Sequence, residues 1–440
     1  LLEPYKEKFN EINPDSKLVI EWSETGCFKR LFLFLGPSVN LVKSSAQNVG
    51  MFDSAFMKNP KYNGQFLGIV TVNGNLNNRI VAVALVHAEN SENYEWFFRN
   101  IKIHAPGVFE KMYLVYYTII SDCDKGLGAS VPISFTNANT LACFKHIKDN
   151  FLTSKDVPNL CSYEGLLWGI QEAKTHRIFK DKLEMLRQKN RYAVGYLENI
   201  PGGDNVWALY KQIEKKILMY DHRTSNVIES ENSRYRTLRE LTPINFLDAI
   251  IKKQCDILNE SRNLVKKFND EGYSLTKAAA DKYKKNETLS NWYLCRKINE
   301  TKAHIWVQNN DGSCTETRIV EFQEDIGTCS CYEWQQMKIP CPHAIKANKE
   351  LKYKTNVFEW YEYAFDSIYM LSSYKAAYTG INLEPPILQE LIPEIADNDN
   401  DSIETKRLAP PRYKTKGRPK KKRMRKRTET LDGRPVKTYK

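Results

Sequence analysis

One run of fifteen residues contains three cysteines and a histidine at close spacing. Cys329 and Cys331 form a C-x-C pair, and Cys341 and His343 follow after nine residues as a C-x-H pair. Four sulfur and imidazole donors are the ligand set of closed, tetrahedral zinc sites. The alternatives are an accidental cluster or disulfides, and two tight pairs favour neither. The spacing therefore predicts a structural zinc site.

The residues around these ligands predict a small ββα unit. Two strand-like runs, AHIWVQ and TRIVEF, flank a polar turn ahead of the cysteines. Pro342 suits the first turn of a helix and the residues after His343 favour one, so the C-x-H pair should begin a helix. Ligands and context together resemble the SWIM zinc finger, which is frequent in Mutator-like (MULE) transposases and their domesticated relatives.

Residues 47–150 read as alternating strands and helices. Three β-rich runs separated by turn residues predict an antiparallel meander. A helix with a serine N-cap should follow in SENYEWFFRNIKI. Next we expect a strand in MYLVYYTIISD, a short helix in KGLGASV, a strand in PISFTN and a helix in ANTLACFKHIKDNF. The periodicity alone gives the fold class α/β. The order is that of an RNase-H-like core, and this sharper prediction depends on the acids.

Two aspartates occupy costly positions in this predicted core. Asp53 lies in the first strand among apolar neighbours, and Asp122 ends the fourth. A carboxylate in or at the end of a buried strand needs a partner, a hydrogen bond or a cation. As the plainer alternatives, Asp53 is a strand-end turn acid and Asp122 is a helix N-cap. Neither acid is specific by itself, and the pair on the first and fourth strands of one core is more specific than either.

Several blocks of the chain resemble MULE transposases. MFDSAFMKNPKYNGQFLGIVTVNGN is similar to their first catalytic block, ENSENYEWFF and SDCDKGL to the next two, and CFKHI to their C-x-x-H element at Cys143 and His146. TSNVIESENSRYRTLRELTPI resembles the block with the final acid, which maps onto Glu229. Glu231 is a nearby competitor, and a first-turn glutamate favoured by the helix dipole is the plainer alternative. We expect Glu229 to open one long amphipathic helix that lies against the strands of Asp53 and Asp122.

The resemblance implies a DDE site. Asp53, Asp122 and Glu229 would hold two Mg²⁺ or Mn²⁺ ions for in-line phosphoryl displacement. The implied activity is DNA nicking at element ends and attack of the freed 3′-hydroxyl on target DNA, in a homo-oligomeric complex. A domesticated, non-catalytic DNA-binding regulator is the alternative. For Cys143 and His146 a structural role is favoured over a second metal site. An upstream DNA-binding region is expected to be missing from this fragment.

The charge of the chain is concentrated at its end. Residues 411–440 hold fourteen basic and two acidic side chains, which accounts for the whole net charge of +12. This points to a polyanionic partner. Within the tail, five residues resemble an AT-hook that fits a narrow minor groove: Lys416, Gly417, Arg418, Pro419 and Lys420. A nuclear-import run is the alternative, and either predicts a nuclear protein close to DNA.

Composition excludes other classes. No apolar run approaches the length of a membrane helix, and no secretory signal opens the chain. The other cysteines are scattered singly, as in a reducing, intracellular setting. The expected organisation begins with a helical and β lead-in (1–46), the first part of the core (47–150) and a helical insertion (151–225). The final core helix with an extension (226–290), the zinc finger (291–355), a helical segment (356–385) and a disordered linker with the basic tail (386–440) follow.

Overall fold

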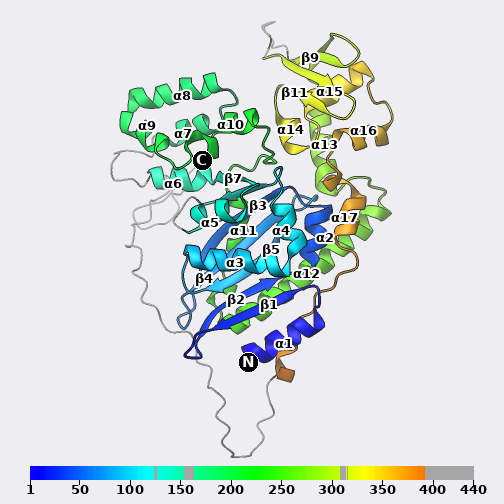
Figure 1. Cartoon of the computed structure of the whole chain (residues 1–440). Helices are drawn as coiled ribbons and strands as arrows, with labels where there is room; N and C mark the ends of the chain where they lie inside the picture. Colours follow the sequence, from blue (N-terminus) through cyan, green and yellow to red (C-terminus); the bar gives the residue numbers. More distant parts are fainter. Residues whose placement is uncertain (123–125, 153–162, 308–313, 315, 392–440) are drawn as a thin grey trace, which may run out of the picture.

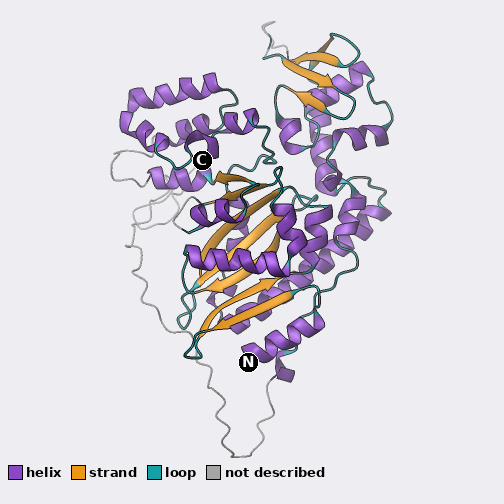
Figure 2. Ribbon diagram, in the orientation of Figure 1, coloured by secondary structure: helices purple, strands orange, loops and turns teal. Residues whose placement is uncertain are grey.

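The structure is a computed structural model, and it describes residues 1–122, 126–152, 163–307, 314 and 316–391. Its centre is a seven-stranded mixed sheet in the order β1-β2-β5-β4-β3-β6-β7 (Figures 1 and 2). The strands are β1 (Lys17–Trp22), β2 (Phe28–Phe34), β3 (Val49–Phe56), β4 (Gln65–Val72), β5 (Asn78–Val86), β6 (Thr118–Ser121) and β7 (Asn139–Ala142).

The sheet has an antiparallel half and a parallel half. β3, β4 and β5 form the predicted antiparallel meander, and β2 and β1 extend it beyond β5. β6 runs parallel to β3 on the other side, and β7 runs parallel to β6. The amino-terminal residues are thus part of the same sheet as the predicted core.

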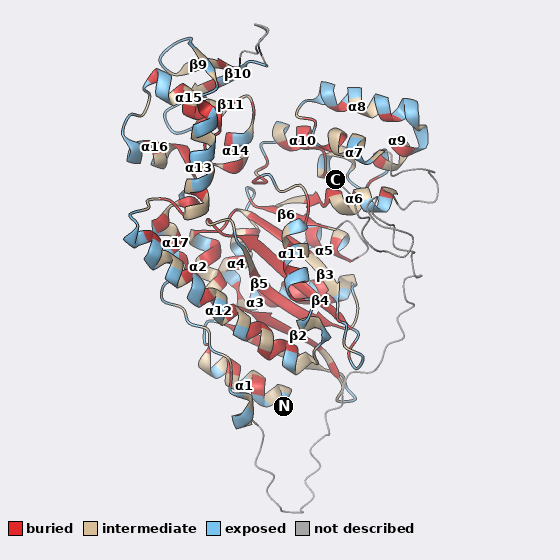
Figure 3. Cartoon of the chain, turned by 180° about the vertical axis from the view of Figure 1, so that it is seen from behind, coloured by how far each residue is buried: buried red, intermediate tan, exposed pale blue. Residues whose placement is uncertain are grey.

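Helices cover both faces of the sheet, so its strands are buried (Figure 3). On one face lie α2 (Pro37–Ser44), α3 (Ser91–His104), α4 (Pro106–Met112) and α5 (Leu127–Ser134), and their apolar residues form one cluster with Phe52 and Leu67. The other face is covered by α1 (Leu2–Ile12), α11 (Asn226–Arg234) and α12 (Pro243–Asp270), which form a second cluster with Met51 and Phe66. Alternate residues of one strand therefore face different helical layers.

A helical lobe follows β7. It comprises α6 (Phe144–Leu152), α7 (Glu164–Gln171), α8 (His176–Lys189), α9 (Arg191–Glu198), η2 (Gly203–Val206) and α10 (Leu209–Glu214). These elements enclose their own apolar cluster around Trp207.

The zinc-ligand region contains a second, smaller sheet. Its antiparallel order is β11-β10-β9-β8, from β8 (Leu294–Lys297), β9 (Lys302–Trp306), β10 (Arg318–Phe322) and β11 (Gly327–Cys329). The helices here are α13 (Lys277–Ser290), α14 (Glu333–Met337), α15 (Pro342–Leu351) and α16 (Val357–Ala364), followed by η4 (Ser367–Tyr369), α17 (Leu371–Ala377) and η5 (Leu388–Leu391). β9, β10 and the start of α15 match the predicted strands and helix, but β8, β11 and α14 were not predicted.

Three predictions in the core were wrong. The strand expected from Met112 begins only at Thr118, because Pro106 starts α4 and this helix continues to Met112. The strand expected in PISFTN is the end of α5, and the true strand is β7. Residues 139–142 pair with buried β6, and this tertiary pairing overrides the helical pattern that begins only at Phe144.

Two predictions of helix ends also need correction. The N-cap of α3 is Asn90, whose Oδ1 accepts a hydrogen bond of 2.9 Å from the backbone N–H of Asn93, and the predicted serine cap, Ser91, is the first helical residue. Glu229 does not open a long helix, because α11 ends at Arg234. After η3 (Leu238–Glu240), the long helix α12 begins at Pro243, which fits a first helical position. None of the described helices is both long and apolar enough to cross a membrane.

Candidate functional site: a Cys3His cluster and an acidic sheet edge

The four predicted zinc ligands converge. One donor atom from each of Cys329, Cys331, Cys341 and His343 lies within 4.8 Å of all the others. Cys329 ends β11, Cys331 lies in the turn before α14, and Cys341 is the N-cap of α15. Pro342 occupies the first position of that helix, which places His343 in its first turn.

The donor set fits a structural zinc ion. The three cysteine side chains are buried and free of disulfides. Hydrogen bonds from Cys329 and Cys341 hold the pKa of Cys331 far below its usual range, while burial raises that of Cys341. The thiol of Cys329 also has a raised pKa, so Cys331 alone is a thiolate without metal. A divalent metal would deprotonate the other two thiols and stabilise three neighbouring thiolates. The buried Nδ1 of His343 has no hydrogen-bond partner among the described residues, as a metal-binding nitrogen permits.

Gln335 braces this cluster from within. Its Oε1 accepts a hydrogen bond of 3.3 Å from the backbone N–H of Cys329, and its Nε2 donates one of 2.9 Å to the carbonyl of the same residue. The ring of Tyr293 packs edge-on against His343, with centroids 4.6 Å apart. The ligands are thus oriented by neighbours within residues 291–355, which we call the zinc module.

The two predicted aspartates lie beside each other on two interior strands of the large sheet, at a place that we call the acidic edge because β6 ends there. β3 and β6 are parallel neighbours, with Met51 opposite Ile120 and Phe52 opposite Ser121. Continuing this register by one residue brings Asp122 beside Asp53. Because side chains alternate along a strand, Asp53 shares the face of Met51, which is the face covered by α11.

α11 brings the third acid to this edge. The helix packs against β3 and β4 and carries Glu229 in its first turn. One turn further, the Nδ2 of Asn232 donates a hydrogen bond of 3.2 Å to Oδ2 of Asp53. Lys145 of α6 forms an ion pair with Glu229, and the Ser225 hydroxyl donates to the same carboxylate at 3.5 Å.

The electrostatics of the edge favour a bound cation. Burial raises the pKa of Asp53 to about 7, and the charges of Glu229 and Glu89 add to this rise, against an opposing effect of His146. For His146, burial lowers the pKa, but a hydrogen bond with Cys143 and the charges of Asp122 and Asp53 outweigh it and raise the value to about 9. A buried, ionised carboxylate is costly without a positive partner. The residues present therefore fit a cation, which would share the edge with the positive charges of His146 and Lys145.

The acids share a neighbourhood without forming a tight ligand set. Among the described residues, the acid-edge group within 4.8 Å of one another is Cys143, His146 and Glu229. Asp122 adjoins this group through a carboxylate oxygen 3.8 Å from His146 Nε2. The resemblance had placed the C-x-x-H pair among the blocks of the acids, but the residues alone favoured a structural role, because no paired ligand lies near it along the chain.

Cys143 also links α6 to α11. Its buried sulfur accepts hydrogen bonds from the backbone N–H of Ser225 at 3.2 Å and from the Ser225 hydroxyl at 3.1 Å. Ser225 is the N-cap of α11. The cysteine thus fixes the start of the helix that carries Glu229, as a structural role would require.

The competing acid Glu231 has a different environment. Its side chain is buried and pairs with Arg234 at 2.8 Å. Burial raises its pKa, while the charges of Arg234 and Arg79 oppose the rise. Among the described residues, Asn232 donates a hydrogen bond to Asp53, and Glu229 is one of the charges that shift the pKa of Asp53, whereas Glu231 is not.

Sequence reasoning missed three neighbours of the acids: Glu89, Lys145 and Asn232. The Tyr94 hydroxyl donates to Glu89 at 2.8 Å, and the charge of Glu89 contributes to the raised pKa of Asp53. Glu89 is the first residue of the block ENSENYEWFF, and Asn232 lies three residues after Glu229. All three residues lie inside the quoted blocks, and this was the available signal.

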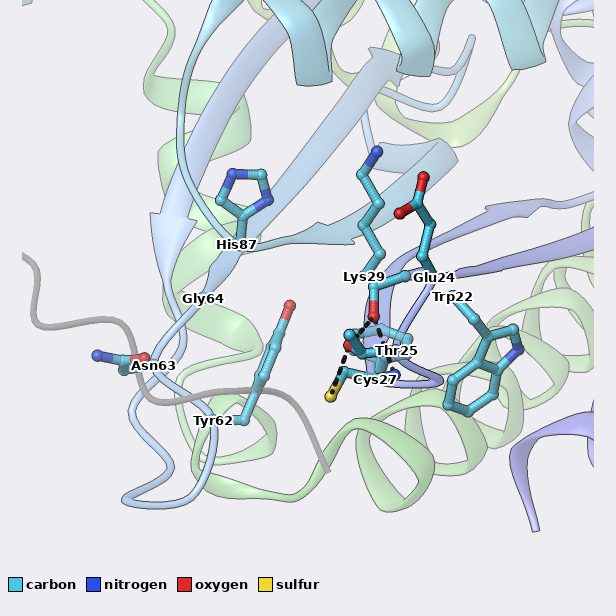
Figure 4. A pocket seen from close by; sticks show the side chains of 11 residues that line it. Trp22, Glu24, Thr25, Cys27, Lys29, Tyr62, Asn63, Gly64 and His87 are labelled. Atoms are coloured by element: carbon cyan, nitrogen blue, oxygen red, sulfur yellow. Dashed lines mark hydrogen bonds between the residues drawn. The ribbon is translucent and has the colours of Figure 1, made fainter. Parts of the chain in front are cut away.

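A separate pocket opens at the same end of the sheet. It has a volume of about 490 Å³ and lies between the turn after β1 and the loop before β4. Figure 4 shows Trp22, Lys29, Tyr62 and His87 around it. None of its lining residues is a predicted acid or zinc ligand. The AT-hook-like residues of the tail lie outside the described residues.

Two family models match the chain. The MULE transposase domain matches residues 49–150, and the SWIM zinc finger matches residues 305–352. The first match includes Asp53 and Asp122 and ends before Glu229, and the second includes all four zinc ligands. No curated protein matches the chain. The resemblance to a MULE transposase with a SWIM finger is therefore confirmed.

Proposed function

We propose that this chain, which carries a MULE transposase domain and a SWIM zinc finger, is a DDE-type transposase that cuts and joins DNA. The observation that carries the proposal is that Asp53, within β3, lies beside Asp122, which follows the end of β6, under the helix that bears Glu229. The sheet order supports an RNase-H-like core, because an antiparallel meander is followed by two parallel strands on the side of its first strand.

The acids would hold the metal ions. Bound Mg²⁺ or Mn²⁺ would stabilise negative charge on the attacking and leaving oxygens of the phosphodiester. Asn232 orients the Asp53 carboxylate, and Lys145 neutralises Glu229. Because Mg²⁺ keeps water and phosphate oxygens among its ligands, a loose carboxylate set accords with a site that DNA completes.

The reaction needs no further cofactor. In nicking, water adds to phosphorus and the 3′-oxygen leaves as a hydroxyl. In joining, that hydroxyl attacks a phosphodiester of the target, so one P–O bond replaces another. The zinc ion is structural in this scheme, since three cysteines and a histidine fill its coordination shell.

The test is metal-dependent nicking and strand transfer on DNA that flanks the coding sequence of the chain. Wild type would be compared with Asp53→Asn, Asp122→Asn and Glu229→Gln. We expect each change to reduce cleavage by at least about a thousandfold while DNA affinity is kept. Glu231→Gln is the matched control on the same helix and should still cut. If Glu231→Gln abolishes cleavage and Glu229→Gln does not, the third acid is Glu231.

A non-catalytic, DNA-binding regulator is the second candidate, favoured by the basic tail. We propose that residues 411–440 contact phosphates or an A·T minor groove and direct the protein to the nucleus. Deleting them should weaken DNA binding and flatten its salt dependence. Wild type that binds DNA but cuts in neither metal would establish the regulator. The enzyme proposal further includes a homo-oligomeric complex on DNA, which sedimentation of the protein with end DNA would test.

A further inference from the structure

A short helix between the zinc ligands is hydrogen-bonded to the segment that leads to Glu229. α14 lies between Cys331 and Cys341 in sequence. The Gln336 Oε1 accepts a hydrogen bond of 3.0 Å from the backbone N–H of Met219, and its Nε2 donates one of 2.8 Å to the carbonyl of Ile217. One side chain thus holds two backbone groups of residues 217–223, which we name the linking segment.

A second path connects α14 to the same segment. The Tyr369 hydroxyl donates to the carbonyl of Met337 at 2.9 Å and accepts from Nε2 of Gln47 at 3.2 Å. The Oε1 of Gln47 in turn accepts from Nε2 of His222 at 2.8 Å. Since Gln47 stands just before β3, this path joins α14, the linking segment and the strand of Asp53.

The linking segment is also tied to the acid edge. The Thr118 hydroxyl, at the start of β6, donates to the carbonyl of Leu218 at 2.7 Å. The backbone N–H of Phe144 donates to the carbonyl of Arg223 at 3.2 Å. Two residues later comes Ser225, the N-cap of α11. A displacement of the segment would therefore move the helix that carries Glu229.

The backbone of this region is strained. Lys216, Tyr220 and Asp221 have φ values of 56°, 50° and 65°, in the left-handed region that residues other than glycine rarely adopt. Such conformations persist only where the surroundings hold them. A cavity of about 540 Å³ lies beside the contact and is lined by Met219 and Gln336, among others. Ile217 and Met219 are buried in the same apolar cluster as Met337, so the contact combines apolar packing with the hydrogen bonds of Gln336.

We propose that the zinc module sets the position of Glu229 through the linking segment, with Gln336 as a positioning residue. Zinc holds Cys331 and Cys341 and thereby fixes α14, α14 fixes the segment, and the segment fixes α11. This inference rests on the proposed function only where it concerns cutting. The structural coupling has a readout of its own.

The adjacent glutamines offer a matched pair. Gln335 binds Cys329 inside the module, whereas Gln336 reaches out to the linking segment. Methionine keeps the length of the side chain and removes both hydrogen bonds. Full-length Gln336→Met and Gln335→Met would be compared with wild type for zinc content, hydrogen exchange of residues 217–234 and DNA nicking with saturating Mg²⁺.

We expect Gln336→Met to keep one zinc ion and unchanged DNA affinity, to exchange at least tenfold faster across the linking segment, and to lose roughly ten- to a hundredfold in the nicking rate at unchanged KM. Added zinc should not restore the nicking rate of Gln336→Met. Gln335→Met should lose zinc more readily, and added zinc should restore its nicking rate. Gln336→Glu, which can still accept from Met219, should be intermediate.

The outcomes separate the two proposals. Unchanged exchange across residues 217–234 in a zinc-loaded Gln336→Met protein would overturn the coupling, whatever the nicking rate. Faster exchange with an unchanged nicking rate would overturn the role of Gln336 in positioning Glu229. If wild type never cuts, the proposed function fails, and the exchange difference alone decides whether zinc and α11 are coupled.

Discussion

The four zinc ligands come from residues 329–343, and their donor atoms lie within 4.8 Å of one another, whereas Asp53, Asp122 and Glu229 come from two neighbouring strands and a distant helix. Neighbouring residues within one short motif determine most of the geometry of the zinc site. The acidic edge depends on strand register, on the packing of α11 and on the linking segment. A site of the first kind can be derived from spacing, and a site of the second kind requires the fold.

Removing zinc should have the largest effect on folding, and it would show whether the zinc site and the acidic edge belong to separate folding units. Apparent zinc-binding free energies of small modules are on the order of 10 kcal/mol and act as folding free energy. We expect Cys341→Ser or chelation to abolish hydrogen-exchange protection in β9, β10 and α15 while β3–β5 keep theirs.

Cys295→Ser is the control for the zinc prediction, because this cysteine lies in β8 of the same module and outside the ligand cluster. It should keep one zinc ion and normal protection. Loss of protection across the large sheet after chelation would contradict the prediction, since it would make the zinc module part of one folding unit with the sheet.

The same contrast explains which predictions succeeded. The zinc ligands and the start of α15 followed from spacing and from Pro342. The pairing of Asp53 with Asp122 followed from the strand order, although the strand before Asp122 was predicted to begin six residues too early. The prediction that Glu229 opens one long helix was wrong, because apolar residues continue at helical spacing through residues 234–243 and concealed the break before Pro243. The contact of Gln336 with Met219 joins positions that no local pattern relates.

Metal-free Asp53→Asn should be more stable than wild type at pH 7.5. The folded pKa of Asp53 is about 7, above the usual 3.8, so the fold favours the protonated form. Stability from this group is complete below pH 4 and is lost as the pH rises through 7, by at most about 4 kcal/mol. Asparagine removes this dependence. Mg²⁺ should raise the Tm of wild type only, as thermal unfolding from pH 4 to 8 would measure. Equal pH profiles would show that Asp53 is not buried at a cation site.

His222→Gln should have the opposite pH signature and tests the linking segment. Burial lowers the folded pKa of His222 to about 4, below the usual 6.5, so the fold favours the neutral ring. Its contribution is complete above pH 6.5 and is lost as the pH falls through 4, by at most about 3 kcal/mol. Glutamine keeps a hydrogen-bond partner for Gln47 and cannot gain this charge. Urea unfolding at pH 7 and pH 4.5 should show a smaller acid loss for the variant than for wild type.

Gly327→Ala tests whether the zinc site depends on local spacing alone, and among these variants of the two sites it should have the smallest effect. A Cβ on Gly327 would stand 1.8 Å from Cη2 of Trp334. That ring cannot withdraw easily, since it is buried and its Nε1 donates to the carbonyl of Ala364 at 2.8 Å. We expect a loss of about 1–3 kcal/mol and weaker zinc retention, because Gly327 and Cys329 share β11.

Gly195→Ala is the counterpart for this last change. Gly195 lies in α9 with nothing within 4 Å of an added Cβ, so alanine should stabilise that helix by about 0.5–1 kcal/mol. Zinc release under competing chelator would rank the three proteins. If Gly327→Ala releases zinc no faster than wild type, the ligand spacing alone sustains the site. Faster release would mean that even this local motif depends on the packing of Trp334, which its spacing does not encode.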